Sequence, residues 1–259
     1  MDAIPIWLVF IGTVVIVIGS IEMGYRVGRA VVARSQGEKE SPASVMSQSL
    51  LALVAFMLAF AFGSVANRFE ARKHLVRLEA NAIGTAWLRA EFLSERDRNS
   101  SRDLMREYVD VRVELQRSTN PENWKAVFNA SDRTHSQLWE IAVENARKDL
   151  NSPVVALYVE SLNEMFDIHG LRVNQGLRAR IAGGIWISLV SLLVLGMISA
   201  GYQTSVAGSI RPRARALLAV SFALVISLIA DLDRPGGGTI GVPYQPLTDL
   251  QTWMSSQTE

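Results

Sequence analysis

The chain has 259 residues, of which 49% are hydrophobic and 20% charged, and its formal net charge is only +1. This balance excludes the strongly basic surface of a nucleic-acid-binding protein, so no nucleic-acid partner is expected. The absence of cysteine excludes disulfides, thiol catalysis and cysteine-based metal sites.

Apolar residues are concentrated in four blocks of the sequence. They occupy residues 4–21, 49–66, 181–200 and 216–230. Crossing the hydrocarbon core of a bilayer takes about 20 apolar residues, and the first three blocks provide such a run without a charge. The fourth is enclosed by Arg215 and Asp231, and it can span if Arg215 extends its head group to the interface. The pattern predicts an all-α integral membrane protein with four transmembrane helices in contact with the lipid bilayer.

The first block is followed directly by an acidic residue, Glu22. Only Asp2 precedes the block as a charged residue, and no small-residue cleavage site follows it, so we expect a retained anchor. An intramembrane carboxylate is a functional hypothesis by default. The alternative is that Glu22 lies in the headgroup zone and pairs with Arg26, one helical turn later.

A single helix is predicted for residues 49–89, which contain no proline. Its first half is apolar and its second half is charged, so we expect lipid around the first half and water around the second. Phe56 and Phe60 share a face of this helix, and Phe62 follows them. Aromatic rings can form a hydrophobic constriction that gates a pore by excluding water. The alternative for all three is lipid contact or helix packing, which the sequence alone favours.

Residues 68–180 are predicted to form an extramembrane antiparallel bundle of about four helices, inserted between the second and third transmembrane helices. The polar residues 94–101 predict a break, and the prolines at 121 and 153 suit the first positions of helices. His74, His135 and His169 are scattered along the sequence, and neither a nucleophile–base set nor a cofactor motif is readable. No enzymatic activity, cofactor or metal site is therefore predicted.

The chain is accordingly divided into four segments. Residues 1–67 hold the first two transmembrane helices, 68–180 the bundle, 181–230 the last two transmembrane helices, and 231–259 a C-terminal tail. We expect a short helix in the tail, on the membrane surface or on the bundle. Short arginine-rich loops follow the first transmembrane helix and join the third to the fourth, so the positive-inside rule places these loops in the cytoplasm. The N-terminus, the bundle and the C-terminus are then periplasmic, in a multi-pass protein of the bacterial inner membrane.

Charged and polar residues gather where this topology brings helix ends to one membrane boundary. They are Asn67, Arg68, Arg72, Glu79, Asp231, Asp233 and Arg234. Half-buried charges need partners, and arginine and carboxylate groups suit one another geometrically. Two interpretations stay open: a structural latch between the transmembrane helices and the bundle, or an electrostatic ring through which ions enter an oligomer.

Three motifs stand at these positions: IEMGYRVGR from Ile21, ANRFEARKHLVRLEANAIGTAWLR from Ala66, and DLDRPGGGTIGVPYQPL from Asp231. Together they resemble the bacterial bestrophin-like membrane family, over nearly the whole chain. The positions that the resemblance marks are Glu22, Gly24, Asn67, Arg68, Glu79, Asn81, Gly84, Arg89, Asp231, Asp233, Arg234, Pro235 and Gly238. Gly236 stands where the family often has a bulky apolar residue.

The resemblance implies kinship with bestrophins, which are oligomeric anion channels with an aromatic-lined neck and a cytoplasmic soluble part. We therefore expect a homo-oligomeric ion channel, for anions, whose second transmembrane helix lines the pore. The alternative is a non-conducting membrane sensor or scaffold, whose outer bundle binds a ligand or a partner. The expected partners are lipid, further copies of the chain and inorganic anions.

Overall fold

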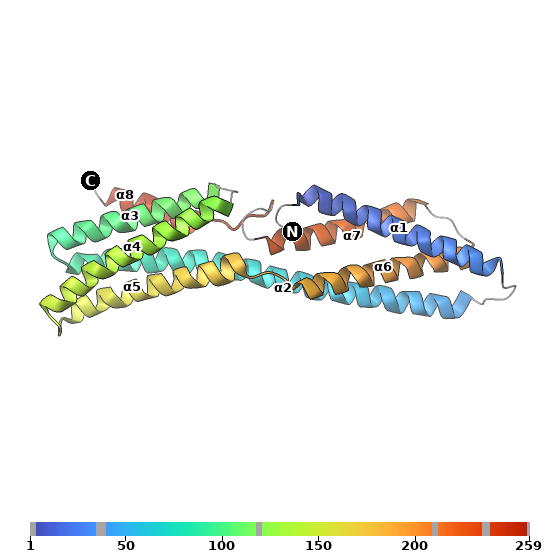
Figure 1. Cartoon of the computed structure of the whole chain (residues 1–259), viewed down its shortest axis with the longest axis horizontal. Coiled ribbons are helices and arrows are strands. Elements are labelled where there is room, and N and C mark those ends of the chain that lie inside the picture. The colour runs from blue at the N-terminus through green and yellow to red at the C-terminus, as the bar shows by residue number, and fades with distance from the viewer. Residues whose placement is uncertain (1–3, 35–39, 118–120, 209–211, 235–238, 258–259) are drawn as a thin grey trace. The chain divides into compact units, whose positions relative to one another are not determined.

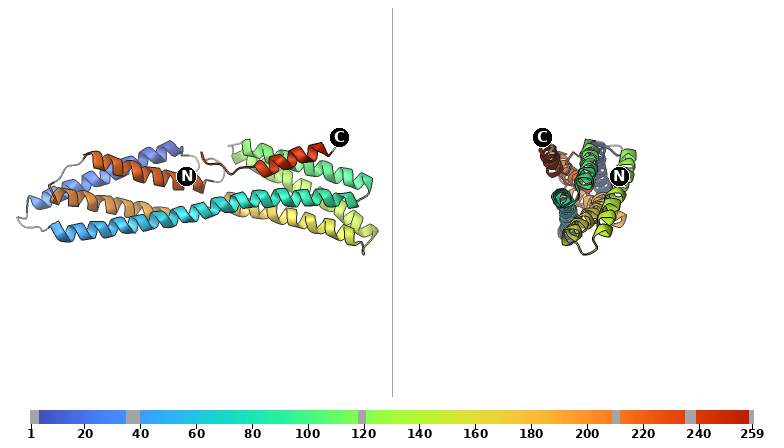
Figure 2. Two further views of the ribbon diagram at one scale, coloured as in Figure 1. Left: turned by 180° about the vertical axis from the view of Figure 1, so that it is seen from behind. Right: turned by 90° about the vertical axis from the view of Figure 1, so that its left-hand side faces the viewer.

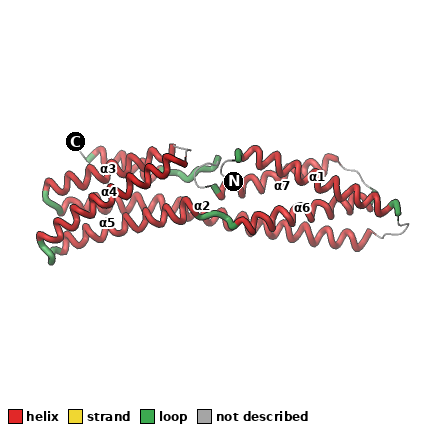
Figure 3. The backbone as a smooth tube through the Cα atoms, in the orientation of Figure 1, coloured by secondary structure: helices red, strands yellow, loops and turns green. Residues whose placement is uncertain are grey.

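The computed structural model describes residues 4–34, 40–117, 121–208, 212–234 and 239–257. Within these ranges every regular element is a helix, as Figure 3 shows, so the predicted all-α class is confirmed for them. The helices are α1 (Ile6–Val32), α2 (Glu40–Arg89), α3 (Glu95–Arg117), α4 (Pro121–Lys148), α5 (Pro153–Leu171), α6 (Gly183–Val206), α7 (Pro212–Asp233) and α8 (Gln245–Ser256) (Figure 1). A 3₁₀ turn, Ala90–Phe92, follows α2, and a π-helical segment, Arg172–Arg178, follows α5.

Helix α2 is one continuous helix of 50 residues. Figure 2 shows it unbroken along its length, which confirms the single helix predicted for residues 49–89. It begins at Glu40, so the interpretation of the polar residues 35–44 as a connecting loop is wrong for residues 40–44, which are helical. Pro42 lies in its first turn, where a proline removes no intrahelical hydrogen bond. Because no further proline follows in α2, its backbone hydrogen bonds continue to Arg89.

The chain forms two compact units. Unit 1 comprises Met1–Arg68 and Arg180–Ile240, and unit 2 comprises Phe69–Ala179 and Gly241–Glu259. Among the described residues, four helices are long and apolar enough to cross a membrane: Ile6–Val32, Ser44–Phe92, Gly183–Val206 and Arg213–Asp233. They coincide with the four predicted transmembrane blocks, and the fourth is completed by residues flanking its shorter apolar run.

Unit 1 is held together by a close crossing of α1 and α6. A Cβ atom added at Gly24 would lie 1.9 Å from the carbonyl oxygen of Ile198, and one added at Gly201 would lie 2.0 Å from that of Ile21. Only a residue without a side chain allows the two backbones this approach. Small residues are the usual means of packing helices in a membrane, where lipid removes the hydrophobic advantage of larger ones.

Unit 2 has a single apolar core built by the second half of α2 and by α3, α4, α5 and α8. Its fully buried side chains include Trp87, Tyr108, Leu138, Leu162 and Met165. Helix α8 contributes Leu247 and Met254, so it packs on this bundle.

Helix α3 begins at Glu95, inside residues 94–101, which the sequence predicted to be a break. Ser94 donates from its hydroxyl to the Asp97 carboxylate at 2.9 Å, and the Asp97 N–H lies 3.4 Å from the same hydroxyl. Ser94 thus acts as an N-cap, whose hydroxyl accepts from a backbone N–H that has no partner within the helix. The polar residues 95–101, read as a break, therefore form the exposed first turns of a helix.

Candidate functional site

The three predicted pore phenylalanines lie on the apolar half of α2. In unit 1, Phe56 and Phe60 are 66% and 56% exposed, and Phe62 is 41% exposed. The opposite side of the helix is buried, at Val54, Leu58, Ala61 and Val65. Phe56 and Phe60 therefore point away from the protomer's own packing, which leaves them for lipid or for another copy of the chain.

Two of the predicted boundary carboxylates, Asp231 and Asp233, are buried and bind backbone groups of unit 1. Asp233 accepts a hydrogen bond from the N–H of Ile181 at 3.0 Å and lies 3.6 Å from the guanidinium of Arg68. Asp231 accepts from the N–H groups of Thr239 and Ile240, and from the Thr239 hydroxyl. These contacts tie the end of α7 to the segments that precede α6 and follow α7, which supports a structural role for both carboxylates.

The remaining members of that set are distributed between the two units. In unit 1, Arg234 donates to the carbonyl of Ile4 at 2.5 Å, and Asn67 is exposed. In unit 2, Arg72 is buried and donates to the carbonyl of Ala179 at 3.2 Å. Glu79 finds its partners within the core of unit 2, described below. Pro235, Gly236 and Gly238 lie outside the described residues.

Glu22 pairs with two arginines of unit 1. Its carboxylate lies 2.9 Å from Nε of Arg26, the partner one turn away that the sequence suggests, and 3.5 Å from Nη1 of Arg215 in α7. The guanidinium of Arg215 also lies 4.7 Å from the ring centre of Tyr25. The carboxylate is thus part of an ion-paired group between the ends of α1 and α7.

A polar network fills the centre of unit 2, around Glu79, which is fully buried. Its carboxylate pairs with Arg112 of α3 at 2.7 Å and with Arg172 at the start of the π-helical segment. It also accepts a hydrogen bond from the Tyr108 hydroxyl at 2.9 Å. Two cations and one hydroxyl therefore converge on one acidic side chain, and we call these four residues the Glu79 network.

The network continues to two histidines. The Tyr108 hydroxyl lies 3.0 Å from Nδ1 of His169, and the His169 ring packs edge-on against that of His135, with centres 4.8 Å apart. Burial, with the positive charge of Arg112, lowers the pKa of His135 to about 4 and that of His169 to about 3. Both imidazoles are therefore neutral at neutral pH. Burial also raises the pKa of Tyr108, which keeps its hydroxyl protonated.

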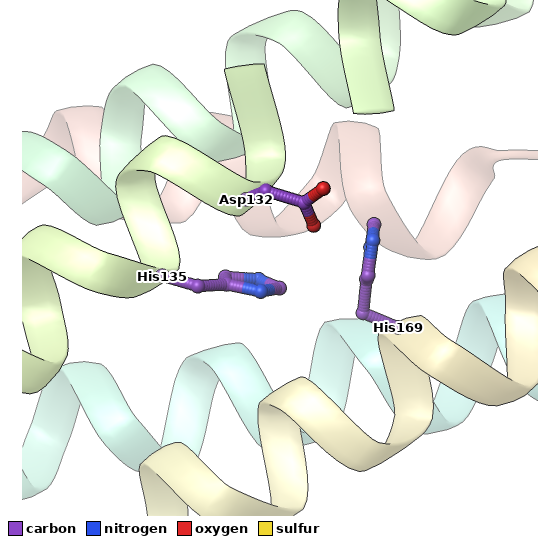
Figure 4. A group of neighbouring side chains, drawn as sticks. All are labelled: Asp132, His135 and His169. Carbon is purple, nitrogen blue, oxygen red and sulfur yellow. The ribbon is translucent and has the colours of Figure 1, made fainter. Parts of the chain in front are cut away.

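Asp132 completes a group with these two histidines (Figure 4). Asp132 and His135 are three residues apart on α4, and His169 comes from α5. The histidines looked scattered because the second is 34 positions beyond the first along the chain. The i, i+3 spacing of Asp132 and His135 was the one signal available, since it places both on one face of a helix.

A comparison with known protein families agrees with the resemblance that the sequence motifs suggest. The profile of the family described as "Bestrophin-like domain" matches residues 9–247, which is most of the chain. The chain belongs to the Bestrophin-like domain family. No curated protein and no solved structure was found to match it.

Several positions that the bestrophin-like resemblance marked have a physical role in the structure. Gly24 permits the α1–α6 crossing, and Glu79 is the centre of its network. Arg89 donates to the carbonyl of Leu157 at 2.6 Å, which joins the end of α2 to α5. These roles concern folding, so the functional surface of this bestrophin-like chain has to be sought among residues that its own fold leaves unpartnered.

Proposed function

We propose that the chain forms a homo-oligomeric channel for inorganic anions, in which α2 lines the pore. On this proposal unit 2 is an extramembrane bundle inserted between the second and third transmembrane helices, and it lies in the periplasm with both termini. The membrane-spanning potential of four helices and the kinship of the family with bestrophins support a channel. Anion selectivity follows from that kinship.

One regularity of α2 carries the proposal. Every seventh residue along it, for six intervals, is exposed: Met46, Leu53, Phe60, Asn67, His74, Asn81 and Leu88. We call these seven residues the α2 stripe. A repeat of seven keeps one side of a helix facing a common axis when several copies wind around one another. An exposed line of this kind leaves α2 able to contact other copies of itself along its whole length.

The chemistry of the α2 stripe changes along its length as a pore lining requires. Leu53 and Phe60 lie in the apolar half, where bulky apolar rings around an axis form a constriction that excludes water. Asn67, His74 and Asn81 lie in the charged half of the helix, where neutral polar side chains suit a water-filled vestibule. Phe56 flanks the stripe, one turn before Phe60, and widens the apolar zone.

The geometry is tested directly by disulfide cross-linking, because the chain has no cysteine of its own. Asn67→Cys in membranes is expected to give cross-linked chains on mild oxidation. Leu224→Cys on α7 is the control, because Leu224 is exposed, as Asn67 is, but lies outside the α2 stripe. Equal cross-linking of the two variants, or none at Asn67→Cys, would contradict an axis formed by α2.

Conduction is tested with purified protein in planar bilayers under a chloride gradient. We expect a current whose reversal potential follows chloride, and a conductance changed several-fold by Phe60→Ala. Leu224→Ala is expected to leave it unchanged. Absence of current over a range of voltage and pH, with the protein shown to be folded and oligomeric, would refute the channel.

A second function is favoured by the group at Asp132, His135 and His169. A non-conducting sensor would bind a ligand in unit 2, and the resulting conformational change would reach the membrane helices through α2. It predicts ligand binding without current, and cross-linking that changes when the ligand is present. Current through the unliganded protein would exclude it.

A further inference from the structure

The group in unit 2 brings together three side chains that commonly bind metal ions. One potential ligand atom each from Asp132, His135 and His169 lies within 4.8 Å of the others. Figure 4 shows the Asp132 carboxylate and the His135 imidazole extending from α4 toward the ring of His169, which comes from α5. Metal sites in helical bundles are built in this way, from a carboxylate and a histidine three residues apart on one helix and a ligand on its neighbour.

The hydrogen bonds of the Glu79 network indicate which nitrogen of His169 carries the proton. Glu79 is an ion-paired carboxylate and can only accept hydrogen bonds, so the single hydroxyl proton of Tyr108 is donated to it. The Tyr108 oxygen must then accept from Nδ1–H of His169, 3.0 Å away. Nε2 of His169 consequently carries the lone pair. Metal-binding histidines are oriented in the same manner, by donating their other N–H to an acceptor.

His135 supplies the second nitrogen. Its Nε2 atom is buried and has no hydrogen-bond partner among the described residues. The ring also packs against that of Phe166, with centres 4.2 Å apart. A buried polar atom without a partner costs about 1–3 kcal/mol, which is a reason to expect a further ligand at this position.

We propose that Asp132, His135 and His169 bind one divalent transition-metal ion, with Zn²⁺ as the best fit. Two neutral imidazoles and one carboxylate match the ligand types of zinc, and three protein ligands leave a position for water or for a small ligand. Mg²⁺ and Ca²⁺ prefer all-oxygen sites and are expected to bind poorly. This proposal does not depend on conduction, so it can be tested independently of the channel proposal.

Geometry and access are compatible with such an ion. Ligand atoms around a tetrahedral Zn²⁺ are about 3.3 Å apart, so the group needs to contract by roughly 1.5 Å, within the reach of side-chain rotation. Asp132 is exposed, His135 is half-buried and His169 is buried, which gives an approach from solvent on the Asp132 side. Nearby, Glu79 pairs with Arg112 and Arg172, and the Asp132 carboxylate adds a negative charge on the side from which the ion would approach.

The test uses the full chain in detergent, stripped of metal with a chelator and freed of any affinity tag. Titration with Zn²⁺ is expected to show one ion per chain, and Co²⁺ is expected to give the visible absorption of tetrahedral coordination. His135→Gln and Asp132→Asn should each weaken Zn²⁺ binding at least tenfold. His74→Gln is the matched control, because His74 is an exposed histidine outside the group and should bind as the parent does.

Each outcome decides the proposal. Saturable binding that is lost in His135→Gln and Asp132→Asn but kept in His74→Gln supports the site. Absence of saturable binding overturns it, and so does binding that all three variants retain or that His74→Gln loses equally. Circular dichroism and elution volume confirm that each variant is folded, so that a loss of binding is assigned to the missing ligand. Competition by excess Mg²⁺ would overturn the assignment to a transition metal.

Discussion

The Glu79 network makes a sharp prediction for the substitution Glu79→Gln. Glutamine has nearly the same size as glutamate and keeps one acceptor oxygen, so packing is preserved while the negative charge is removed. Arg112 and Arg172, both buried, are then left without a counter-charge. The perturbation therefore isolates the electrostatic contribution of one fully buried carboxylate.

The magnitude follows from the number of partners. Removing one partner of a buried ion pair costs about 3–5 kcal/mol, because the remaining charge stays desolvated. Glu79 serves two guanidiniums, and the retained oxygen compensates in part, so we expect a loss of about 4 kcal/mol in the free energy of unfolding of unit 2. Since domains are stable by only about 5–15 kcal/mol, such a loss makes the unit marginal.

The assay is hydrogen exchange of the full chain in detergent, followed by mass spectrometry on peptides from α3 and α5. A loss of about 4 kcal/mol corresponds to a roughly thousandfold rise in the opening equilibrium. Glu160→Gln is the control, because Glu160 pairs with Arg89 but is 70% exposed, and such pairs contribute at most about 1 kcal/mol. A rise below tenfold for Glu79→Gln, or an equal rise for Glu160→Gln, would refute the reasoning.

Two further predictions concern packing and pH. Gly201→Ala places a Cβ atom 2.0 Å from the carbonyl oxygen of Ile21 and should lower the unfolding temperature in detergent. Gly63→Ala, which meets nothing within 4 Å, should not, and equal shifts would contradict the proposed helix crossing. Burial depresses the pKa of His135 to about 4 and of His169 to about 3, so the unfolded chain binds more protons below pH 6.5. Without metal, the free energy of unfolding of unit 2 should fall by on the order of 1 kcal/mol per histidine for each pH unit as the pH is lowered from 6.5 to 4. Stability measured as flat across this range would show that the histidines are not buried.

Local composition explains what the sequence could predict. The four apolar blocks and the unbroken helix through residues 49–89 depend on runs of neighbouring residues, and both reappear in the structure. The start of α3 was missed although its signal was present, since Ser94 and Asp97 have the spacing of a helix cap. A polar run does not by itself separate a loop from the exposed turns of a helix.

The partners of Glu79 could not be predicted, because they are set by packing between distant segments. Arg112 and Arg172 lie 33 and 93 positions beyond it along the chain. The sequence contains many arginines that could pair with Glu79. Only the packing of α2, α3 and the segment after α5 brings these two to it. The same holds for His135 and His169, which are unrelated in sequence and adjacent in unit 2.

These long-range contacts also clarify which side of α2 is free to act. Glu79, Val76 and Trp87 are buried in the core of unit 2, and Val54 and Val65 are buried in unit 1. The same helix thus supplies a packed side to each unit, and the α2 stripe is what neither unit covers.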